Sequence, residues 1–214
     1  GFAESDPTLD VEGVDAAYKI SIITLHAFGK HIQTKDIIRK GITALKENDF
    51  KYAKEKDLVI KLIAKSHLNK NGELNIISVL PTFIKKDHTL GQTNNEYNGL
   101  LIGSSLADEQ FLYGKGAGRY PTSSAVLSDI SAIKYGYRYE YKKGIINSSE
   151  YSKESVKCYV SFDREVAFDR SVFDSINEEY ICEDIQYIIG NIQTDLFRDT
   201  QLFEDKRISL ICFN

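Results

Sequence analysis

The segment that ends at Lys19 gathers the charged side chains with the clearest capacity for chemistry. Five carboxylates precede this lysine: Glu4, Asp6, Asp10, Glu12 and Asp15. Asp15 and Lys19 are four positions apart, so on a helix they share one face, with the acid before the base. One interpretation is a surface ion pair that stabilises the helix by roughly a few tenths of a kcal/mol. The other is a lysine held by carboxylates beside a polar substrate, where burial tunes it for proton transfer.

A helix must carry both of these side chains. Asp10 follows the helix-excluding pair Asp6-Pro7 and is a good N-cap, which predicts a helix over 10–29. The apolar residues at helical spacing are Val11, Val14, Ala17, Tyr18, Ile22, Leu25 and Phe28. Lys19 therefore lies beside the apolar stripe. Shorter helices are predicted over 34–40, closed by Gly41, and over 48–56.

The pattern then changes to that of antiparallel strands. Short apolar runs separated by turn residues predict strands over 58–64, 73–79, 97–103 and 109–113. The glycine-rich link GKGAG at 114–118 leads into a helix predicted over 121–134, with Pro121 at its start. This link has the spacing GxGxG and not the dinucleotide fingerprint GxGxxG, and its flanking strands are antiparallel. It indicates either a close approach of the backbone to a ligand or a tight strand-to-helix turn.

The last third of the chain predicts a smaller unit. Residues 135–151 are polar, aromatic and rich in turn formers, which is typical of a linker. Beyond them the sequence predicts a strand over 157–162, a helix over 170–179 and strands over 183–190 and 207–214. We therefore predict an α+β fold: a mixed, largely antiparallel sheet with helices on one face, plus a small C-terminal α/β unit. The predicted domains are residues 1–140 and residues 152–214.

Composition excludes several classes of protein. The chain has 214 residues, 42% of them hydrophobic, and a net charge of −4, which is typical of a globular protein. It has no basic patch for nucleic acid and no apolar run of the roughly 18 residues that a membrane span needs. Without a signal peptide we expect a cytoplasmic protein. The chain holds no Met, even at its first position, which we interpret either as a piece of a longer protein or as modified methionines left out of the sequence.

The cysteines and histidines predict no metal centre. Cys158, Cys182 and Cys212 are far apart and form no CxxC pair, so we expect buried, reduced thiols. The histidines are His26, His31, His67 and His88. None of them has an acidic or cysteine partner at the spacing of metal ligands, so we expect no bound metal.

The segment that ends at Lys19 also resembles a known family. GFAESDPTLDVEGVDAAYK is similar to the signature of homoserine dehydrogenases, approximately G-[YF]-x-E-x-D-P-x-x-D-[VL]-x-G-x-D-x-x-x-K, and meets every fixed position. The resemblance continues through 49–53, 60–62 and 79–81 and reaches GKGAGRYPT at 114–122, with Asp129 beyond. It covers about residues 1–135.

This resemblance implies an enzyme that interconverts L-homoserine and L-aspartate 4-semialdehyde, in threonine and methionine biosynthesis, by hydride transfer with NADP or NAD. Lys19 matches the family's active-site lysine, the proton donor and acceptor at the substrate oxygen. The family's substrate-binding carboxylates match Glu4, Asp10 and Asp15, and its cofactor-contacting glycines match Gly1 and Gly118. These roles agree with the chemistry, because an alcohol that loses hydride needs a base for its proton and a cation beside its oxygen.

The resemblance also implies a partner and a missing part. Members of the family pair through the sheet of the substrate domain, so we expect a homodimer. Their nucleotide-binding domain has no counterpart in this sequence, and we expect the chain alone to have little activity. The C-terminal unit is ACT-like at best, because it lacks the usual Pro-Gly turn at 162–167. Two alternatives stay open: a stand-alone amino-acid-binding regulatory module, and a different oxidoreductase with the same substrate-domain fold.

Overall fold

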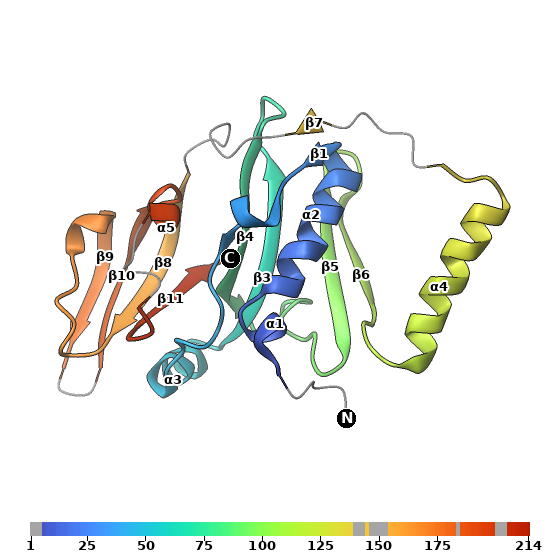
Figure 1. Cartoon of the computed structure of the whole chain (residues 1–214). Helices are drawn as coiled ribbons and strands as arrows, with labels where there is room; N and C mark the ends of the chain where they lie inside the picture. Colours follow the sequence, from blue (N-terminus) through green and yellow to red (C-terminus); the bar gives the residue numbers. More distant parts are fainter. Residues whose placement is uncertain (1–5, 139–143, 146–153, 183–184, 200–204) are drawn as a thin grey trace.

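The structure is a computed structural model, and it describes residues 6–138, 144–145, 154–182, 185–199 and 205–214. Its main strands are β2 Ile38–Arg39, β3 Leu58–Leu68, β4 Leu74–Lys85, β8 Ser155–Phe162, β9 Phe173–Ile181, β10 Gln186–Gln193 and β11 Ile208–Phe213. They form a seven-stranded mixed sheet in the order β2-β4-β11-β8-β10-β9, with β3 also paired to β4. Figure 1 shows this sheet extending from β9 at one edge to β3 and β4 at the centre of the molecule.

The predicted amino-terminal helix is divided in two by Gly13. Helix α1 spans Thr8–Val11 and α2 spans Val14–Phe28. Gly13 has φ +70°, and a Cβ atom on it would lie 2.8 Å from Cγ1 of Val79 in β4. The turn approaches β4 so closely that only glycine fits, and this contact interrupts the helix. Helix α2 ends at Gly29, as predicted, with a second left-handed backbone.

Gly13→Ala should lower the free energy of unfolding by about 2 to 3 kcal/mol, because it adds a clash with Val79 to the strain of a left-handed backbone. Gly72→Ala is the matched control, since Gly72 has φ +76° but no atom within 4 Å of an added Cβ. Gly72→Ala should lower the free energy of unfolding by only about 1 kcal/mol, which is the strain of a left-handed backbone without any clash. Equilibrium unfolding in urea measures both, and equal losses would show that the contact with Val79 does not require glycine.

Helices cover one face of the sheet at β3. Alternate residues of this strand point to the same face, and on that face they are Leu58, Ile60, Leu62 and Ala64. The last two pack against Ala17 and Ile20 of α2. The first two belong to the cluster around Ala53 of α3 (Glu47–Glu55), the helix predicted over 48–56. This face of β3 therefore contacts α3 near its start and α2 further along.

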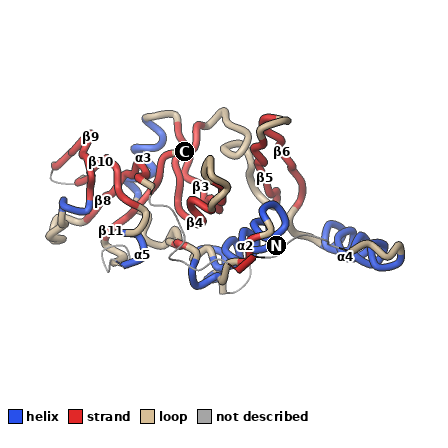
Figure 2. Tube along the Cα trace, turned by 90° about the horizontal axis from the view of Figure 1, so that it is seen from above, coloured by secondary structure: helices blue, strands red, loops and turns tan. Residues whose placement is uncertain are grey.

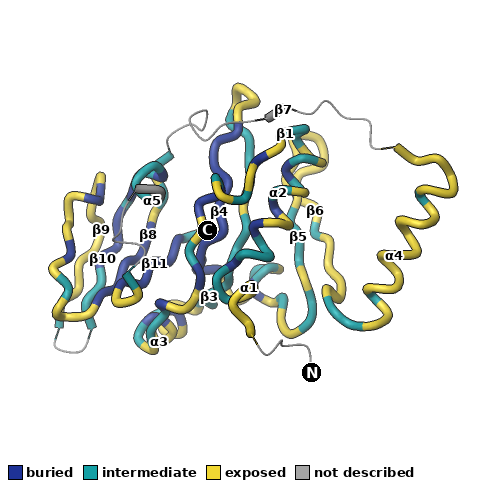
Figure 3. Tube along the Cα trace, in the orientation of Figure 1, coloured by how far each residue is buried: buried dark blue, intermediate teal, exposed yellow. Residues whose placement is uncertain are grey.

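Strand β4 is the most buried strand of the sheet and is exposed only at its last residue (Figure 3). On one side it pairs with β3 along its whole length, as the predicted hairpin requires. On the other side β2 pairs with it in parallel at Ser78 and Val79, and β11 pairs in parallel at Thr82 and Phe83. Pro81 lies at the changeover between these two short partners. This position suits a residue that has no backbone N–H to donate.

Two of the predicted helices are wrong. The segment 34–40 forms the 3-10 turn η1 (Thr34–Asp36) and then β2, and the segment 170–179 forms the 3-10 turn η3 (Arg170–Val172) and then β9. In both places pairing with another strand overrides the local pattern, because β2 lies along β4 and β9 lies along β10.

The predicted antiparallel meander is also divided. Strands β5 (Tyr97–Ser104) and β6 (Asp108–Lys115) form a hairpin, but within the described ranges it pairs with no strand of the main sheet. Helix α4 (Arg119–Lys134) follows and stands apart from the sheet in Figures 1 and 2. None of its residues is buried, as Figure 3 shows. No helix in the described part of the chain is long and apolar enough to cross a membrane.

The C-terminal strands continue the main sheet. Strand β11 pairs with β8 in antiparallel register and with β4 in parallel, so it joins the tail to the first part of the chain. The described connections within the tail hold only η3 and the short helix α5 (Leu196–Asp199). The structure is thus a mixed α/β protein with one large sheet and few helices. The division into two domains and the ACT-like nature of the tail stay predictions.

A buried carboxylate joins α3 to the tail. Asp49 is fully buried and accepts hydrogen bonds from Ser161 Oγ at 2.7 Å and from the backbone N of Lys46 at 2.9 Å. Burial and the nearby charge of Asp49 raise the pKa of the Tyr159 hydroxyl beside it. Lys46 Nζ also donates to Asp163 at 2.8 Å. The N-terminus of α3 is therefore fastened to β8 and to the loop that follows it.

Candidate functional site

The candidate catalytic pair lies on the outer face of α2. Lys19 Nζ is 2.6 Å from Asp15 Oδ2, so the ion pair expected from their spacing forms. The buried face of α2 consists of Ala17, Ile20 and Thr24, which turns the pair away from the sheet. The side chains of Lys19 and Asp15 are 58% and 44% exposed, and an ion pair this exposed contributes little to stability. The fold does not depend on this pair, which leaves it available for chemistry.

Asp10 lies in α1, just before the interruption at Gly13, and its side chain is exposed. Three hydrogen bonds fasten the α1–α2 junction to the segment 39–43: from Arg39 Nη1 to Glu12 O at 2.6 Å, from Thr43 Oγ1 to Glu12 Oε1 at 2.7 Å, and from Ile42 N to Val11 O at 2.8 Å. These bonds fix α1 against the start of α2. They therefore set where Asp10 lies relative to Asp15 and Lys19.

The sequence did not predict these hydrogen bonds between the α1–α2 junction and the segment 39–43. It assigned Gly41 to the end of a helix, whereas Gly41 is a buried point of contact with the α1–α2 junction. A Cβ atom on Gly41 would lie 2.5 Å from Val11 O and 2.6 Å from Glu12 Oε2. The glycine itself was the available signal, because glycine is needed both at helix ends and where two backbones approach closely.

Gly118, the other candidate that the structure describes, is not brought to this pair. Gly118 precedes α4 with φ 119° and ψ 158°, a backbone conformation that favours glycine. Its helix stands apart from α2 in Figures 1 and 2. Gly1 and Glu4 lie outside the described residues. Of the described candidates, Asp15 and Lys19 are in direct contact, and Asp10 lies on the adjoining helix α1.

A second lysine, Lys61 of β3, is set more deeply than Lys19. Its Nζ donates to Thr93 O at 2.6 Å and to Asn94 Oδ1 at 2.9 Å, and burial lowers its pKa. Both acceptors belong to the loop between β4 and β5. These bonds give Lys61 a structural role, since they hold that loop against the sheet.

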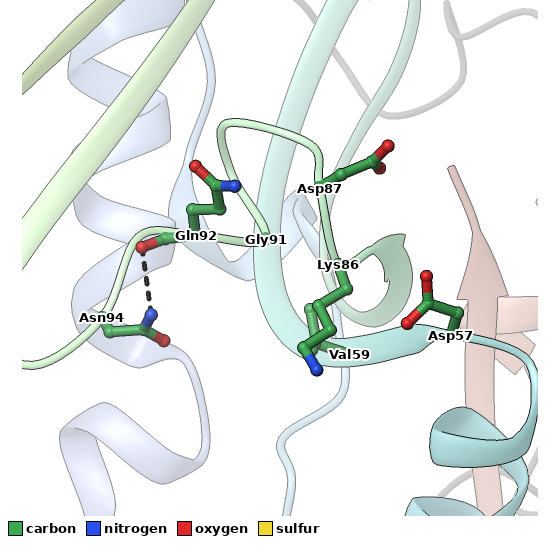
Figure 4. Close-up of a pocket in the computed structure, with 7 residues that line it drawn as sticks. All are labelled: Asp57, Val59, Lys86, Asp87, Gly91, Gln92 and Asn94. Atoms are coloured by element: carbon green, nitrogen blue, oxygen red, sulfur yellow. Dashed lines mark hydrogen bonds between the residues drawn. The ribbon is translucent and has the colours of Figure 1, made fainter.

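The pocket in Figure 4 lies at the same loop and measures about 550 Å³. It is lined by Asp57, Val59, Lys86, Asp87, Gly91, Gln92 and Asn94. The dashed line in Figure 4 marks the bond from Asn94 Nδ2 to Gln92 O, at 3.0 Å. None of these residues belongs to the candidate set. Among the described residues, no group of three or more His, Cys, Asp or Glu side chains is placed to hold a metal.

Comparison with known proteins relates this fold and site to one family. The family model described as homoserine dehydrogenase matches residues 1–131. Homoserine dehydrogenase of Synechocystis sp. is 34% identical over 197 residues, which are 90% of this chain and 43% of that protein. The Bacillus subtilis homoserine dehydrogenase is 36% identical over 138 residues, or 64% of this chain and 31% of that one.

Solved structures agree with these relatives. The crystal structure of S. aureus homoserine dehydrogenase at pH 6.5 matches with a TM-score of 0.68 and 27% identity, over 99% of this chain and 55% of that chain. The homoserine dehydrogenase of Thiobacillus denitrificans matches with a TM-score of 0.71 over the same shares of the two chains. Its identity is 22%, so it supports the fold alone.

These matches define a class of protein, the oxidoreductases, and the chain corresponds to part of one. Because the family model matches residues 1–131, more than half of its length, the chain belongs to the homoserine dehydrogenase family. It spans less than half the length of the two curated relatives above. The substrates and partners of the whole protein are therefore matters for proposal.

Proposed function

We propose that this chain is the catalytic region of an enzyme that interconverts L-homoserine and L-aspartate 4-semialdehyde, with NADP or NAD as the hydride carrier. The observation that carries the proposal is the Asp15–Lys19 ion pair on the outer face of α2, inside the segment that matches the family. The pair is well formed although the fold gains little from it.

Lys19 holds and moves the proton at the substrate hydroxyl. In the direction of oxidation its neutral amine accepts this proton while hydride leaves the carbon, and in the direction of reduction its ammonium donates the proton back. Asp15, 2.6 Å from Nζ, orients the side chain. The ammonium also stabilises negative charge that develops on the substrate oxygen. When bound, the nicotinamide ring supplies the hydride acceptor.

The carboxylates near Lys19 bind the amino-acid part of the substrate. A substrate ammonium group needs negative partners at a fixed distance from the reacting hydroxyl. Asp10 and Asp15 supply two of them, and Glu4, outside the described residues, supplies the third. The hydrogen bonds from 39–43 to the α1–α2 junction keep Asp10 in position.

Gly118 fits a contact with the nicotinamide cofactor. It has no side chain, and its backbone conformation at the start of α4 lets a flat ring lie against the chain. Apolar side chains are exposed along the same helix: Val126, Leu127, Ile130 and Ile133. Such an uncovered helix supports a cofactor site that a further part of the protein completes.

A second copy of the chain is the proposed partner, and the β5–β6 hairpin is its proposed place of contact. A hairpin of two strands is marginally stable alone. In this hairpin Leu112 is 58% exposed and Ile102 is 38% exposed, so a partner that covers them would stabilise it. Sedimentation equilibrium should show a dimer, and Leu112→Asp should shift it to the monomer because a charge would be buried in the interface. A wild-type chain that stays monomeric at all concentrations would contradict this contact.

The function is tested on the protein expressed from its native gene, with whatever precedes Gly1. Purified protein should reduce NADP or NAD when L-homoserine is added, as followed by the absorbance of the reduced cofactor. Binding of an amino acid without any cofactor reduction would instead favour the regulatory module. Oxidation of another alcohol in preference to L-homoserine would favour a different oxidoreductase.

A further inference from the structure

A second pocket lies where the α1–α2 junction, the segment after β2 and the turn before β11 meet. It measures about 240 Å³, which is below the roughly 300 Å³ or more of pockets for drug-sized ligands and suits a smaller group. Its lining residues are Glu12, Arg39, Lys40, Gly41, Thr43, Ala44 and Lys206. None of them belongs to the candidate catalytic set. Lys206 comes from the C-terminal tail, so the pocket joins parts of the chain that are distant in sequence.

The lining is strongly cationic. Three basic side chains, Arg39, Lys40 and Lys206, face one carboxylate, that of Glu12. Glu12 Oε1 already accepts a hydrogen bond from Thr43 Oγ1 at 2.7 Å. Arg39 donates from Nη1 to Glu12 O, and a guanidinium has further N–H donors for an anion.

The described acids nearest to the pocket, Asp205 and Asp163, each have a cation partner outside its lining. Asp205 is engaged by the guanidinium of Arg207, whose hydrogen bonds lower the pKa of the Asp205 carboxyl to about 2. Asp205 also interacts with Lys40, which is therefore the least available of the three cations. Asp163 is paired with Lys46 at 2.8 Å. Arg39 and Lys206 are the cations left to attract a ligand.

The floor of the pocket consists of small residues. Gly41 and Ala44 are both buried. Gly41 has no room for a Cβ atom, because Val11 O would lie 2.5 Å from it. Gly41 therefore keeps the α1–α2 junction in contact with the floor, and the open space of about 240 Å³ lies above it among the basic side chains.

We propose that this pocket binds a small ligand through an oxyanion group, a carboxylate or a phosphate, held by Arg39 and Lys206. The ligand would also lie against Glu12, whose backbone and side chain fasten α1 to the segment 39–43. Its binding would connect the C-terminal tail to the helices that carry Asp10 and Lys19. This site goes beyond the proposed function and does not depend on it.

Nuclear magnetic resonance titration of the chain tests the site directly. Sodium phosphate and sodium succinate are added in separate series at constant ionic strength, and the backbone amide shifts of Gly41 and Thr43 are followed. We expect saturable shifts for at least one probe, with a dissociation constant of about 1 to 10 mM, since Arg39 and Lys206 are both exposed to solvent. Phosphate alone would assign the site to phosphorylated ligands, and succinate alone to carboxylates.

Charge variants separate the pocket from general attraction of anions. Lys206→Glu should weaken binding about tenfold or more, because it places a negative charge where a cation stood. Lys206→Arg should bind as the wild type does. Lys70→Glu, an exposed lysine in the turn between β3 and β4, makes the same change in net charge and should leave binding unchanged. Shifts that never saturate, or an equal loss in Lys70→Glu, would overturn the proposal.

Discussion

Replacing Lys19 by alanine should lower kcat for L-homoserine oxidation by about 10²- to 10⁴-fold, the range that a positioned proton-transfer group contributes. The free energy of unfolding should change by less than about 0.5 kcal/mol, because the side chain is 58% exposed and its ion pair with Asp15 is solvated. Cofactor-reduction assays on the protein from its native gene and urea unfolding of the same variant measure the two effects.

Lys51→Ala is the matched control for this variant. Lys51 lies on α3, is also 58% exposed, and forms the same kind of ion pair, 2.9 Å from Glu47 four residues earlier. It should lose its ion pair without loss of turnover. If Lys19→Ala retained near-normal turnover, or if Lys51→Ala lost as much, Lys19 would not be the proton-transfer group and the pair would be a surface feature.

Asp49→Ala should have the largest effect on stability, about 3 to 4 kcal/mol. The variant leaves Ser161 Oγ and the backbone N of Lys46 buried without their acceptor, and a hydrogen bond to a charged group contributes about 1.5 to 3 kcal/mol. The bond from the backbone N of Lys46 is the one by which Asp49 caps the first turn of α3. Equilibrium unfolding in urea measures the total.

A double-mutant cycle assigns this loss to the contact between α3 and the tail. Ser161→Ala and the double variant should give a coupling energy of about 1 to 2 kcal/mol with Asp49→Ala, because the two side chains are 2.7 Å apart. Asp87→Ala, at an exposed aspartate in the loop after β4, should change stability by less than about 0.5 kcal/mol. If the losses of the two single variants simply added up in the double variant, Asp49 would act within α3 alone and not through Ser161.

The sequence by itself determined the local elements and the family. Gly29 ends α2, the turn at 69–72 joins β3 to β4, and α3 and α4 lie within two residues of their predicted bounds. It also determined the Asp15–Lys19 ion pair, because helical spacing alone brings these side chains together. These features depend on residues a few positions apart, which a single sequence displays.

Only the tertiary structure decided the features that depend on distant partners. The segment 170–179 is predicted as a helix, but most of it forms β9 and pairs with β10. The helix predicted over 10–29 is interrupted at Gly13, because the turn there lies too close to Val79 for a side chain. The hairpin β5–β6 leaves the main sheet, whereas β11 joins it beside β4. Arg39, Glu12 and Lys206 line one pocket because the tertiary structure brings their distant segments together. Strand pairing and close backbone approach release free energy only when remote segments meet, and no local pattern in the sequence records which segments those are.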